Sequence, residues 1–555
     1  MKPEKESHNL EHHWTRSAVV YQIYPRSFKD SNGDGIGDLR GIIQKLDYLN
    51  DGTERSLGIN AIWINPIYPS PMKDFGYDVS DYYSIDPLFG TMADFETLVS
   101  YAHARTIKIL MDFVPNHTSS QHPWFLESRS SRMNKKRDWY IWRDPKPDGN
   151  PPNNWLSVFG GPAWTFDATT GQYYLHSFLK DQPDLNWRTI EVREEMEHVL
   201  RFWLQKGVDG FRTDSISYLI KDDGFRDDPP NPNYIAGRSN PYDALLHIYS
   251  QGRPELLSAA NTLCKVLDAY PHAFMVSEAY LGIPKMVELY RACDNNLHAP
   301  FNFNLITLPW NGESFKTFID EFDAHLRPDD CPNYVFGNHD RSRVATRLGQ
   351  KRARIAAVLQ CTLRGMPFIY YGEEIGMEDL PVKEETGLDP WGKNVPGFNL
   401  GRDPERTPMQ WDDTLHAGFS TSTPWLPLAN NFRTINVARE SLNPRSMLTL
   451  YRTLIHIRTH TPALLNGSYH SLPLQGGKDI FSFIRIYKKE GILIMINFSD
   501  TSHVVSFSED VLRGFLNTGC RVLCNTECND AKKYMNIDTL TLRPYEAYVL
   551  ALPSK

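Results

Sequence analysis

The sequence predicts an α/β protein: a (β/α)8 TIM barrel with a small domain inserted after strand 3 and a C-terminal antiparallel β-sandwich domain. Short apolar runs rich in β-branched and aromatic residues alternate with helical patterns over most of the 555 residues. Two connections between these runs are far longer than ordinary loops. From about Leu472 the pattern changes to the residue-by-residue alternation of antiparallel strands.

The eight expected barrel strands are bounded apolar runs, with helical patterns such as Met92–Arg105 and Arg343–Leu363 between them. An open doubly wound sheet is the alternative, but no glycine-rich phosphate fingerprint follows the first strand. The runs are Val19–Tyr24, Ala61–Asn65, Ile107–Val114, Gly210–Thr213, Phe274–Ser277, Ala299–Phe303, Tyr334–Phe336 and Pro367–Tyr371.

These patterns divide the chain into a barrel in two parts, residues 1–114 and 187–471, an inserted domain at 115–186 and a β domain at 472–555. The insertion contains a strand-like Tyr-Tyr-Leu-His at 173–176. The second long connection, 371–443, is expected to shape one entrance of a site. Strands of the last domain are expected at Ile480–Tyr487, Ile492–Asn497, His503–Phe507 and Ala547–Leu552.

Composition narrows the class of protein. Hydrophobic content of 41% and charged content of 23% are those of a globular protein, and a net charge of −8 argues against nucleic acid or an anionic membrane as partner. The sequence shows no apolar run of the kind that forms a secretory signal or a membrane span. Seven scattered cysteines indicate reduced thiols and a cytoplasmic location. Cys520, Cys524 and Cys528 are evenly spaced, but no nearby histidine completes a metal site.

The segment 207–216 carries the first candidate for chemistry. Gly207 and Gly210 end a helical pattern and lead into a short strand, on which Arg212 and Asp214 share a face. A guanidinium beside a carboxylate lowers the pKa of that carboxylate and keeps it ionised, as a carboxylate nucleophile requires. A structural ion pair is the alternative interpretation.

Carboxylates also follow two other expected strands. In a barrel, side chains at the C-terminal ends of the strands converge. Asp214, Glu278 and Asp340 stand at three such ends, and His117, Arg212 and His339 stand beside them. This arrangement predicts a common site for all six residues. A network of buried ion pairs is the structural alternative.

Several motifs resemble the α-amylase superfamily, glycoside hydrolase family 13. DFVPNHTS (112–119), GFRTDS (210–215), the glutamate of MVSEAY (275–280) and FGNHD (336–340) are similar to its four signature regions. QPDLN (182–186) resembles the fifth region in the form used by α-glucosidases and oligo-1,6-glucosidases. YQIYPRSF (21–28), GYDVSDY (76–82) and GRDPERTPMQW (401–411) resemble the same exo-acting group.

The resemblance implies that Asp214 is the nucleophile, Glu278 the general acid/base and Asp340 the transition-state stabiliser. A retaining glycosidase needs two carboxyls about 5–5.5 Å apart. Two neighbouring carboxylates and partial burial are expected to raise the pKa of Glu278, so that it begins the reaction protonated.

The resemblance also implies a closed pocket for a terminal glucose, and hence exo attack from the non-reducing end. Asp78 and Arg402 are the implied pair that grips the far hydroxyls, although Arg406 lies in the same motif. His117 and His339 are implied hydrogen-bond donors. Tyr77 is the implied stacking platform, with core packing as the alternative.

A structural metal is implied at the loop Asp30–Asp38. Asp30, Asn32, Asp34, Ile36 and Asp38 alternate as in the first half of an EF-hand, but position 12 is Gly41, so it is not an EF-hand. In the resembling family such a loop binds one Ca²⁺ or Mg²⁺ away from the catalytic centre. A metal-free loop of Asx turns is the alternative. No organic cofactor is expected.

The expected activity is release of glucose from short α-glucosides. Ser215 follows the implied nucleophile. In the resembling family, valine at this position tends to accompany α-1,6 activity and smaller residues α-1,4 activity, so the resemblance implies α-1,4 substrates such as maltose. Oligo-1,6-glucosidase, trehalose-cleaving and sucrose-cleaving activities are alternatives within the family, and transfer to an acceptor hydroxyl uses the same intermediate. A non-catalytic, transporter-associated relative is a distant alternative. The expected partner is a small α-glucoside, and the expected state is a monomer or homodimer.

Overall fold

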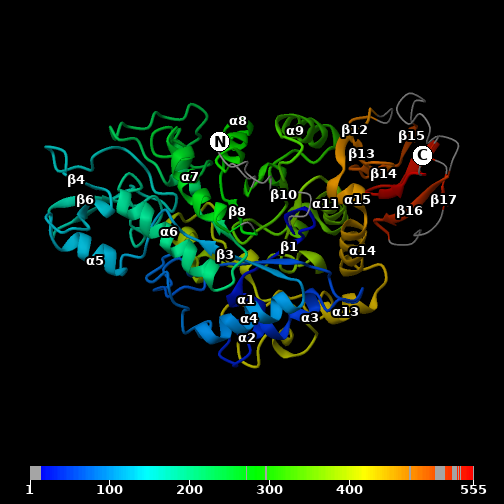
Figure 1. Cartoon of the computed structure of the whole chain (residues 1–555), viewed down its shortest axis with the longest axis horizontal. Coiled ribbons are helices and arrows are strands. Elements are labelled where there is room, and N and C mark those ends of the chain that lie inside the picture. The colour runs from blue at the N-terminus through cyan, green and yellow to red at the C-terminus, as the bar shows by residue number, and fades with distance from the viewer. Residues whose placement is uncertain are drawn as a thin grey trace, which may run out of the picture.

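The computed structural model describes residues 14–270, 272–293, 297–473, 477–506, 519–527, 534–535, 537 and 539–553. Its centre is a parallel eight-stranded sheet in the order β10-β11-β1-β2-β3-β7-β8-β9 (Figure 1). This confirms the predicted barrel. The strands are β1 (Val20–Ile23), β2 (Ala61–Ile64), β3 (Lys108–Phe113), β7 (Gly210–Thr213), β8 (Phe274–Ser277), β9 (His298–Pro300), β10 (Asn333–Val335) and β11 (Met366–Tyr370).

The barrel closes in two different ways. The last strand pairs with the first, with Val20 opposite Phe368. Between β9 and β10 the contact is irregular. The backbone amide of Val335 donates to the carbonyl of Asn302, and the Asn302 amide donates to Oδ1 of Asn333. The asparagine side chain therefore replaces part of the ladder at this seam.

Helices follow the strands because their apolar residues recur on one face. In α6, the buried side chains Val192, Met196, Val199, Leu200, Trp203 and Leu204 form that face. In α4, Thr91 and Asp94 form a reciprocal capping box that satisfies two backbone amides. The longer helices are α4 (Met92–Ala104), α5 (Pro123–Ser130), α6 (Ile190–Gln205), α7 (Leu256–Asp268), α8 (Ile283–Tyr290), α9 (Gly312–His325), α11 (Gln350–Thr362) and α14 (Met447–His460). The shorter ones are α1 (Pro25–Phe28), α2 (Leu39–Gln44), α3 (Leu46–Leu49), α10 (Val344–Leu348), α12 (Pro390–Asn394), α13 (Val437–Leu442) and α15 (Pro462–Asn466).

The insertion after β3 contains its own antiparallel sheet, in the order β4-β6-β5. The strands are β4 (Trp142–Arg143), β5 (Trp164–Asp167) and β6 (Gln172–Leu175), and β6 covers most of the predicted strand at 173–176. A small apolar cluster supports it, formed by Ile141, Trp155, Ala163, Trp164 and Leu175. In Figure 1 this region projects from one side of the barrel.

The C-terminal region is a separate antiparallel layer on the opposite side (Figure 1). Its main sheet has the order β12-β13-β14-β19-β16-β17, and β15 pairs with β18. The strands are β12 (Ser468–Ser471), β13 (Ile480–Tyr487), β14 (Glu490–Asn497), β15 (His503–Ser506), β16 (Cys520–Asn525), β17 (Tyr534–Met535), β18 (Thr539–Leu542) and β19 (Ala547–Ala551). The predicted end of the third strand, Phe507, lies outside the described residues.

The cysteines correct one expectation. Cys264 of α7 and Cys293, which follows α8, form a disulfide, so the prediction of reduced thiols is wrong for this pair. Disulfides persist mainly in oxidising compartments, and the cysteine argument for a cytoplasmic location is therefore lost. Cys520 and Cys524 are buried on β16, and Cys528 lies outside the described residues. Within the described ranges, no helix has the length and hydropathy of a membrane span.

Candidate active site

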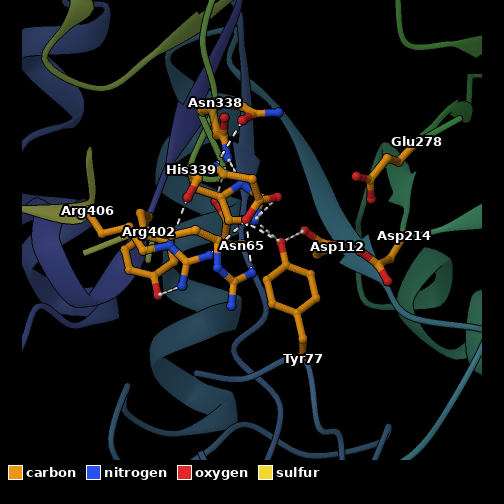
Figure 2. A network of polar contacts seen from close by, with 12 residues as sticks. Asn65, Tyr77, Asp112, Asp214, Glu278, Asn338, His339, Arg402 and Arg406 are labelled. Carbon is orange, nitrogen blue, oxygen red and sulfur yellow. Dashed lines mark hydrogen bonds and ion pairs between the residues drawn. The ribbon is translucent and has the colours of Figure 1, made fainter. Parts of the chain in front are cut away.

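Arg212 joins two carboxyls at the C-terminal ends of β7 and β8. Its Nη1 donates to Oδ1 of Asp214 at 2.8 Å, and its Nη2 donates to Oε2 of Glu278 at 2.5 Å. All three side chains are nearly inaccessible to solvent. Figure 2 shows the two carboxyls beside the polar network around Tyr77 and His339. The structure thus brings together residues that are far apart in the sequence, as expected from the barrel.

Asp112, the fifth residue of β3, holds the same guanidinium from the other side. Its Oδ1 accepts from Arg212 Nη1 at 2.8 Å, and its Oδ2 accepts from Trp63 Nε1 and the Tyr77 hydroxyl. A buried cation is costly unless it is paired, and here three carboxyls surround it. Arg212 is therefore fixed in position and remains charged.

Burial, rather than Arg212, dominates the pKa of Asp214. Removal from water raises its pKa to about 6 even though the Arg212 guanidinium opposes the shift. The expectation that Arg212 would lower this pKa below its ordinary value is therefore corrected. Burial also raises the pKa of Glu278 to about 8, with the charges of Asp214 and Asp340 adding to the effect. The pKa of Asp214 therefore lies below that of Glu278, so that Asp214 loses its proton first as the pH rises.

Asp340, just beyond β10, has the opposite electrostatic environment. Its Oδ1 accepts from Arg406 Nη2 at 2.8 Å and from Arg402 Nη1 at 3.1 Å, and its Oδ2 lies 3.3 Å from His339 Nε2. Burial raises its pKa, but the positive charges of Arg402 and Arg406, together with the contact to His339, outweigh burial and hold the pKa well below the ordinary value. Asp340 is therefore a permanent negative charge near neutral pH.

Tyr77 is the centre of the polar network. Its hydroxyl lies 2.7 Å from His339 Nε2 and accepts from Asn65 Nδ2 at 2.7 Å, and its ring stacks on the His339 ring at 5.4 Å. Gln22 contacts the other ring nitrogen of His339. Tyr77 and His339 both line the cavity. These contacts fix the orientation of both rings.

His117 also lines the cavity and is held from two sides. Its Nε2 lies 3.1 Å from the carbonyl of Tyr77 and 3.1 Å from Nε2 of Gln182. Burial lowers the pKa of His117 to about 4, and burial likewise lowers the pKa of His339. Both imidazoles are therefore neutral near pH 7.

The predicted pair of Asp78 and Arg402 does not form. The Asp78 carboxylate is fully buried and accepts from the backbone amides of Lys73 and Asp74 and from Ser70 Oγ, so it fixes the loop after β2. Asp74 takes the expected place: its Oδ1 accepts from Arg402 Nη2 at 2.6 Å. Asp74 lies two positions before the motif GYDVSDY (76–82), so the motif pointed to Asp78, and only the fold shows that Asp74 faces the cavity.

Asp389 was also missed. It precedes α12 in the long connection after β11, and its Oδ1 accepts from Arg402 Nε at 2.9 Å. Arg402 is thus held by Asp74, Asp340 and Asp389 together. Asp389 occurs in no motif that the sequence analysis used, so only the fold could reveal it.

The cavity has a volume of about 440 Å³. Asp74 and Arg402 line one part of it. The segment after Asp214 lines another, where the Tyr218 hydroxyl lies 3.0 Å from that of Tyr242. Residues 217–251 were not assigned to the site from the sequence. The cavity is also lined by Val158, Phe159, Phe178, Ser215, Ser217, Asn240, Asp243, Gln251, Tyr280, Arg341, Trp391 and Leu400.

Lys221 anchors the inserted domain to the segment after Asp214. Its Nζ lies 2.7 Å from Asp184 Oδ2 and donates to Asn116 Oδ1 at 2.8 Å, and all three residues are buried. Asp184 belongs to QPDLN and Asn116 to DFVPNHTS. A single buried ammonium thus connects these two motifs to the segment that follows Asp214.

The loop of residues 30–38 is held by its own side chains. Asp30 accepts from the amides of Asn32, Gly33 and Gly35 and from Ser420 Oγ, and Asp38 accepts from Ser31 and caps α2. The donors named in the sequence analysis are all oxygens, which Ca²⁺ and Mg²⁺ prefer. Within the described ranges, however, the three loop carboxylates do not gather closely enough to share an ion in this conformation. The metal assignment stays a prediction.

A deep cavity with one permanently ionised carboxylate and two carboxyls of graded acidity defines a glycoside hydrolase type of site. The alpha amylase catalytic domain matches residues 22–467 as a family model. An α-glucosidase of Culex pipiens is 39% identical, with 97% of this chain and 90% of the relative covered. An oligo-1,6-glucosidase of Parageobacillus thermoglucosidasius is 38% identical over 98% of this chain and 100% of its own length.

A solved structure shows the same fold. The crystal structure of an α-glucosyl transfer enzyme, XgtA, superimposes with a TM-score of 0.88 at 38% identity, covering 98% of this chain and 100% of that one. The chain therefore belongs to the α-amylase family, glycoside hydrolase family 13. It is a glycoside hydrolase of the glucosidase group in that family.

Proposed function

We propose that this protein is an exo-acting, retaining α-glucosidase that releases glucose from the non-reducing end of short α-1,4-linked glucosides. The observation that carries the proposal is the bridge from Arg212 to Asp214 and Glu278. It holds two carboxyls side by side while their pKa values, about 6 and about 8, differ enough for one to be ionised and the other protonated.

In the first step, an Asp214 oxygen attacks the anomeric carbon of the terminal glucose. The bond from that carbon to the glycosidic oxygen breaks, and Glu278 gives its proton to the departing oxygen. The oxocarbenium-like transition state is positively charged, and the fixed negative charge of Asp340 stabilises it. The product of this step is a covalent glucosyl–Asp214 ester.

In the second step, Glu278 acts as a base. It removes a proton from water, the water oxygen attacks the anomeric carbon, and Asp214 leaves as a carboxylate. Two inversions at the same carbon restore the α configuration. Replacement of water by a sugar hydroxyl gives transglucosylation through the same intermediate.

Exo attack is supported by the closed end of the cavity. The ion pair of Asp74 and Arg402 joins the loop after β2 to the connection after β11. Charged donors and acceptors of this kind bind sugar hydroxyls through charge-assisted hydrogen bonds. A wall of this kind leaves room for a chain end rather than for the interior of a polysaccharide.

The linkage preference rests on Ser215, which lines the cavity directly after Asp214. Its small side chain supports an α-1,4 preference; oligo-1,6-glucosidase activity is the alternative, since relatives of both kinds are similar to this chain. Rates on maltose, isomaltose, trehalose and sucrose distinguish them. Faster turnover of isomaltose than of maltose would overturn the assignment.

The proposal extends to a structural Ca²⁺ or Mg²⁺ at the loop of Asp30, Asn32, Asp34, Ile36 and Asp38, where the ion would replace hydrogen bonds within the loop. A small α-glucoside is the partner, and a monomer or homodimer is the assembly.

The deciding experiment follows the anomer of the product and the site of the ester. We expect α-glucose as the first product released from maltose, seen by rapid NMR, with oligosaccharide by-products at high maltose. A fluorinated glucosyl fluoride should leave a glucosyl adduct on the peptide that contains Asp214, detected by mass spectrometry. Initial release of β-glucose would exclude the retaining mechanism.

A further inference from the structure

A second large cavity lies at the end of the barrel opposite the catalytic carboxyls. Its volume is about 960 Å³. Asn60 and Thr106, which precede β2 and β3, line it, whereas the catalytic carboxyls follow the strands at their other ends. The remaining walls come from the loop before β2, from α14 and from β16, so the cavity lies where the barrel and the C-terminal sheet meet. Figure 1 shows α14 at this junction.

The walls of this cavity are cationic. Arg55 from the loop, Arg452 from α14 and Arg521 from β16 line it, and Glu54 is the acidic residue among the lining residues. His456 and His460 add imidazole donors. In a chain with a net charge of −8, three arginines against one glutamate make a local positive field.

The arginines have unused hydrogen-bonding capacity. Within the described part of the chain, neither Arg55 nor Arg521 makes a side-chain hydrogen bond or ion pair, and Glu54 is directed to His456 at 3.8 Å. Arg452 Nη2 donates to Ser441 at 3.3 Å, and its Nε is buried without a partner. A guanidinium has five donors in a planar fork that matches phosphate oxygens.

The rest of the lining decides the class of ligand. Hydroxyls surround the arginines, from Thr53, Ser56, Thr106, Thr449, Thr453 and Thr459. The apolar lining is aliphatic, from Leu57, Ile457, Val522 and Leu523, and no Phe, Tyr or Trp is among the described residues that line the cavity. A sugar-binding surface normally offers an aromatic platform. Arginines with hydroxyls and no platform favour an oxyanion.

We propose that this cavity binds a phosphate-bearing small molecule, which bridges the barrel, α14 and the C-terminal sheet through Arg55, Arg452 and Arg521. A ligand that binds only the assembled junction stabilises the folded protein by mass action. Because the cavity is remote from the carboxyls, the ligand does not compete with substrate. The proposal does not depend on the activity assigned above.

The test measures thermal unfolding of the full chain with inorganic phosphate and, separately, glucose 6-phosphate, against sodium chloride at equal ionic strength. We expect a saturable rise in melting temperature with phosphate. The double variant R55Q/R521Q should lose at least nine-tenths of that rise, and R327Q, which removes an exposed arginine elsewhere, should keep it. Stronger binding of glucose 6-phosphate than of phosphate would identify a sugar phosphate as the ligand, and the reverse would identify free phosphate.

Two controls keep the outcomes separate. Near-ultraviolet circular dichroism and turnover of maltose show whether each variant is folded. An equal rise in the wild type, R55Q/R521Q and R327Q proteins would show a general salt effect and overturn the proposal. Competitive inhibition of maltose turnover at the concentration that gives the thermal shift would place the anion in the catalytic cavity and overturn it as well. The absence of any rise in the melting temperature of the wild type with phosphate or glucose 6-phosphate would also overturn the proposal.

Discussion

Arg402 contacts Asp74 at 2.6 Å across 328 positions of sequence. Both residues line the cavity, whereas Asp78, the residue that the motif suggested, contacts Asp74 only through its backbone amide. The relationship separates a carboxylate that lines the cavity from a structural one four residues away.

D74N should raise KM for maltose by roughly tenfold or more, because a charge-assisted contact to the terminal sugar and to Arg402 is lost. D78N should change KM less and lower stability by about 1 kcal/mol, because its carboxylate accepts backbone amides. Steady-state kinetics and thermal unfolding of both variants check this. A larger effect of D78N on KM would favour the motif over the structure.

The pH dependence of kcat/KM should be bell-shaped. Activity rises as Asp214 loses its proton near pH 6 and falls as Glu278 loses its proton near pH 8. In E278Q the alkaline limb should disappear. In this variant kcat/KM for maltose should fall at least about a thousandfold, and kcat/KM for an activated aryl α-glucoside much less, since its leaving group needs no proton in the first step. An unchanged alkaline limb in E278Q would assign that limb to another group.

Glu373, just beyond β11, should make the protein less stable at alkaline pH. Burial raises its pKa to about 7, while the Tyr451 hydroxyl donates to its Oε1. A raised pKa means that the stabilisation is fully present below the unfolded value, near 4.5, and is lost as pH rises through 7.

E373Q keeps a neutral side chain at every pH. Its melting temperature relative to wild type should therefore increase between pH 5 and pH 8, by an amount equivalent to at most about 3 kcal/mol. E321Q, at an exposed glutamate on α9, is the matched control and should show no such trend. A difference between E373Q and wild type that is constant with pH would contradict the assignment.

Millimolar Ca²⁺ or Mg²⁺ should raise the melting temperature of the wild type if the loop of residues 30–38 binds an ion. D34N is the variant that tests this metal site most directly. Asp34 is exposed, so its replacement should abolish the response with little change in the metal-free protein. Calorimetry that detects no binding of either ion to the chelator-treated wild type would exclude the site.

The disulfide of Cys264 and Cys293 closes a loop with a sequence separation of 29. Its loss in C264S/C293S should cost about 3–4 kcal/mol of stability on the chain-entropy model. A reductant should lower the melting temperature of wild type toward that of the variant. C331S, which removes a buried thiol that forms no disulfide, should still respond to reductant. If reductant leaves the melting temperature of the wild type unchanged, the disulfide contributes little to its stability.

The sequence predicted the barrel and the three carboxylates because the rule that strand ends converge needs only the strand positions. Arg212 and Asp214 could be placed on one face from the period of a strand alone. Prediction from the sequence failed for features that are set by contacts between distant loops. The contacts of Asp74 and Asp389 depend on the position of the Arg402 guanidinium in the folded protein. Cys264 and Cys293 come together only when α7 and α8 pack. The pKa of Asp214 depends on burial, which a local pair of residues does not reveal.

The pairing of β1 with β11 sets the order in which the molecule can be assembled during translation. Val20 is among the first residues of the barrel to leave the ribosome, yet its partner Phe368 is made some hundreds of residues later. Until then one edge of β1 has no hydrogen-bonding neighbour, and an open strand edge invites pairing with other chains. The nascent enzyme therefore passes most of its synthesis in a form that needs protection from aggregation, and truncation before β11 should yield insoluble protein rather than a smaller enzyme.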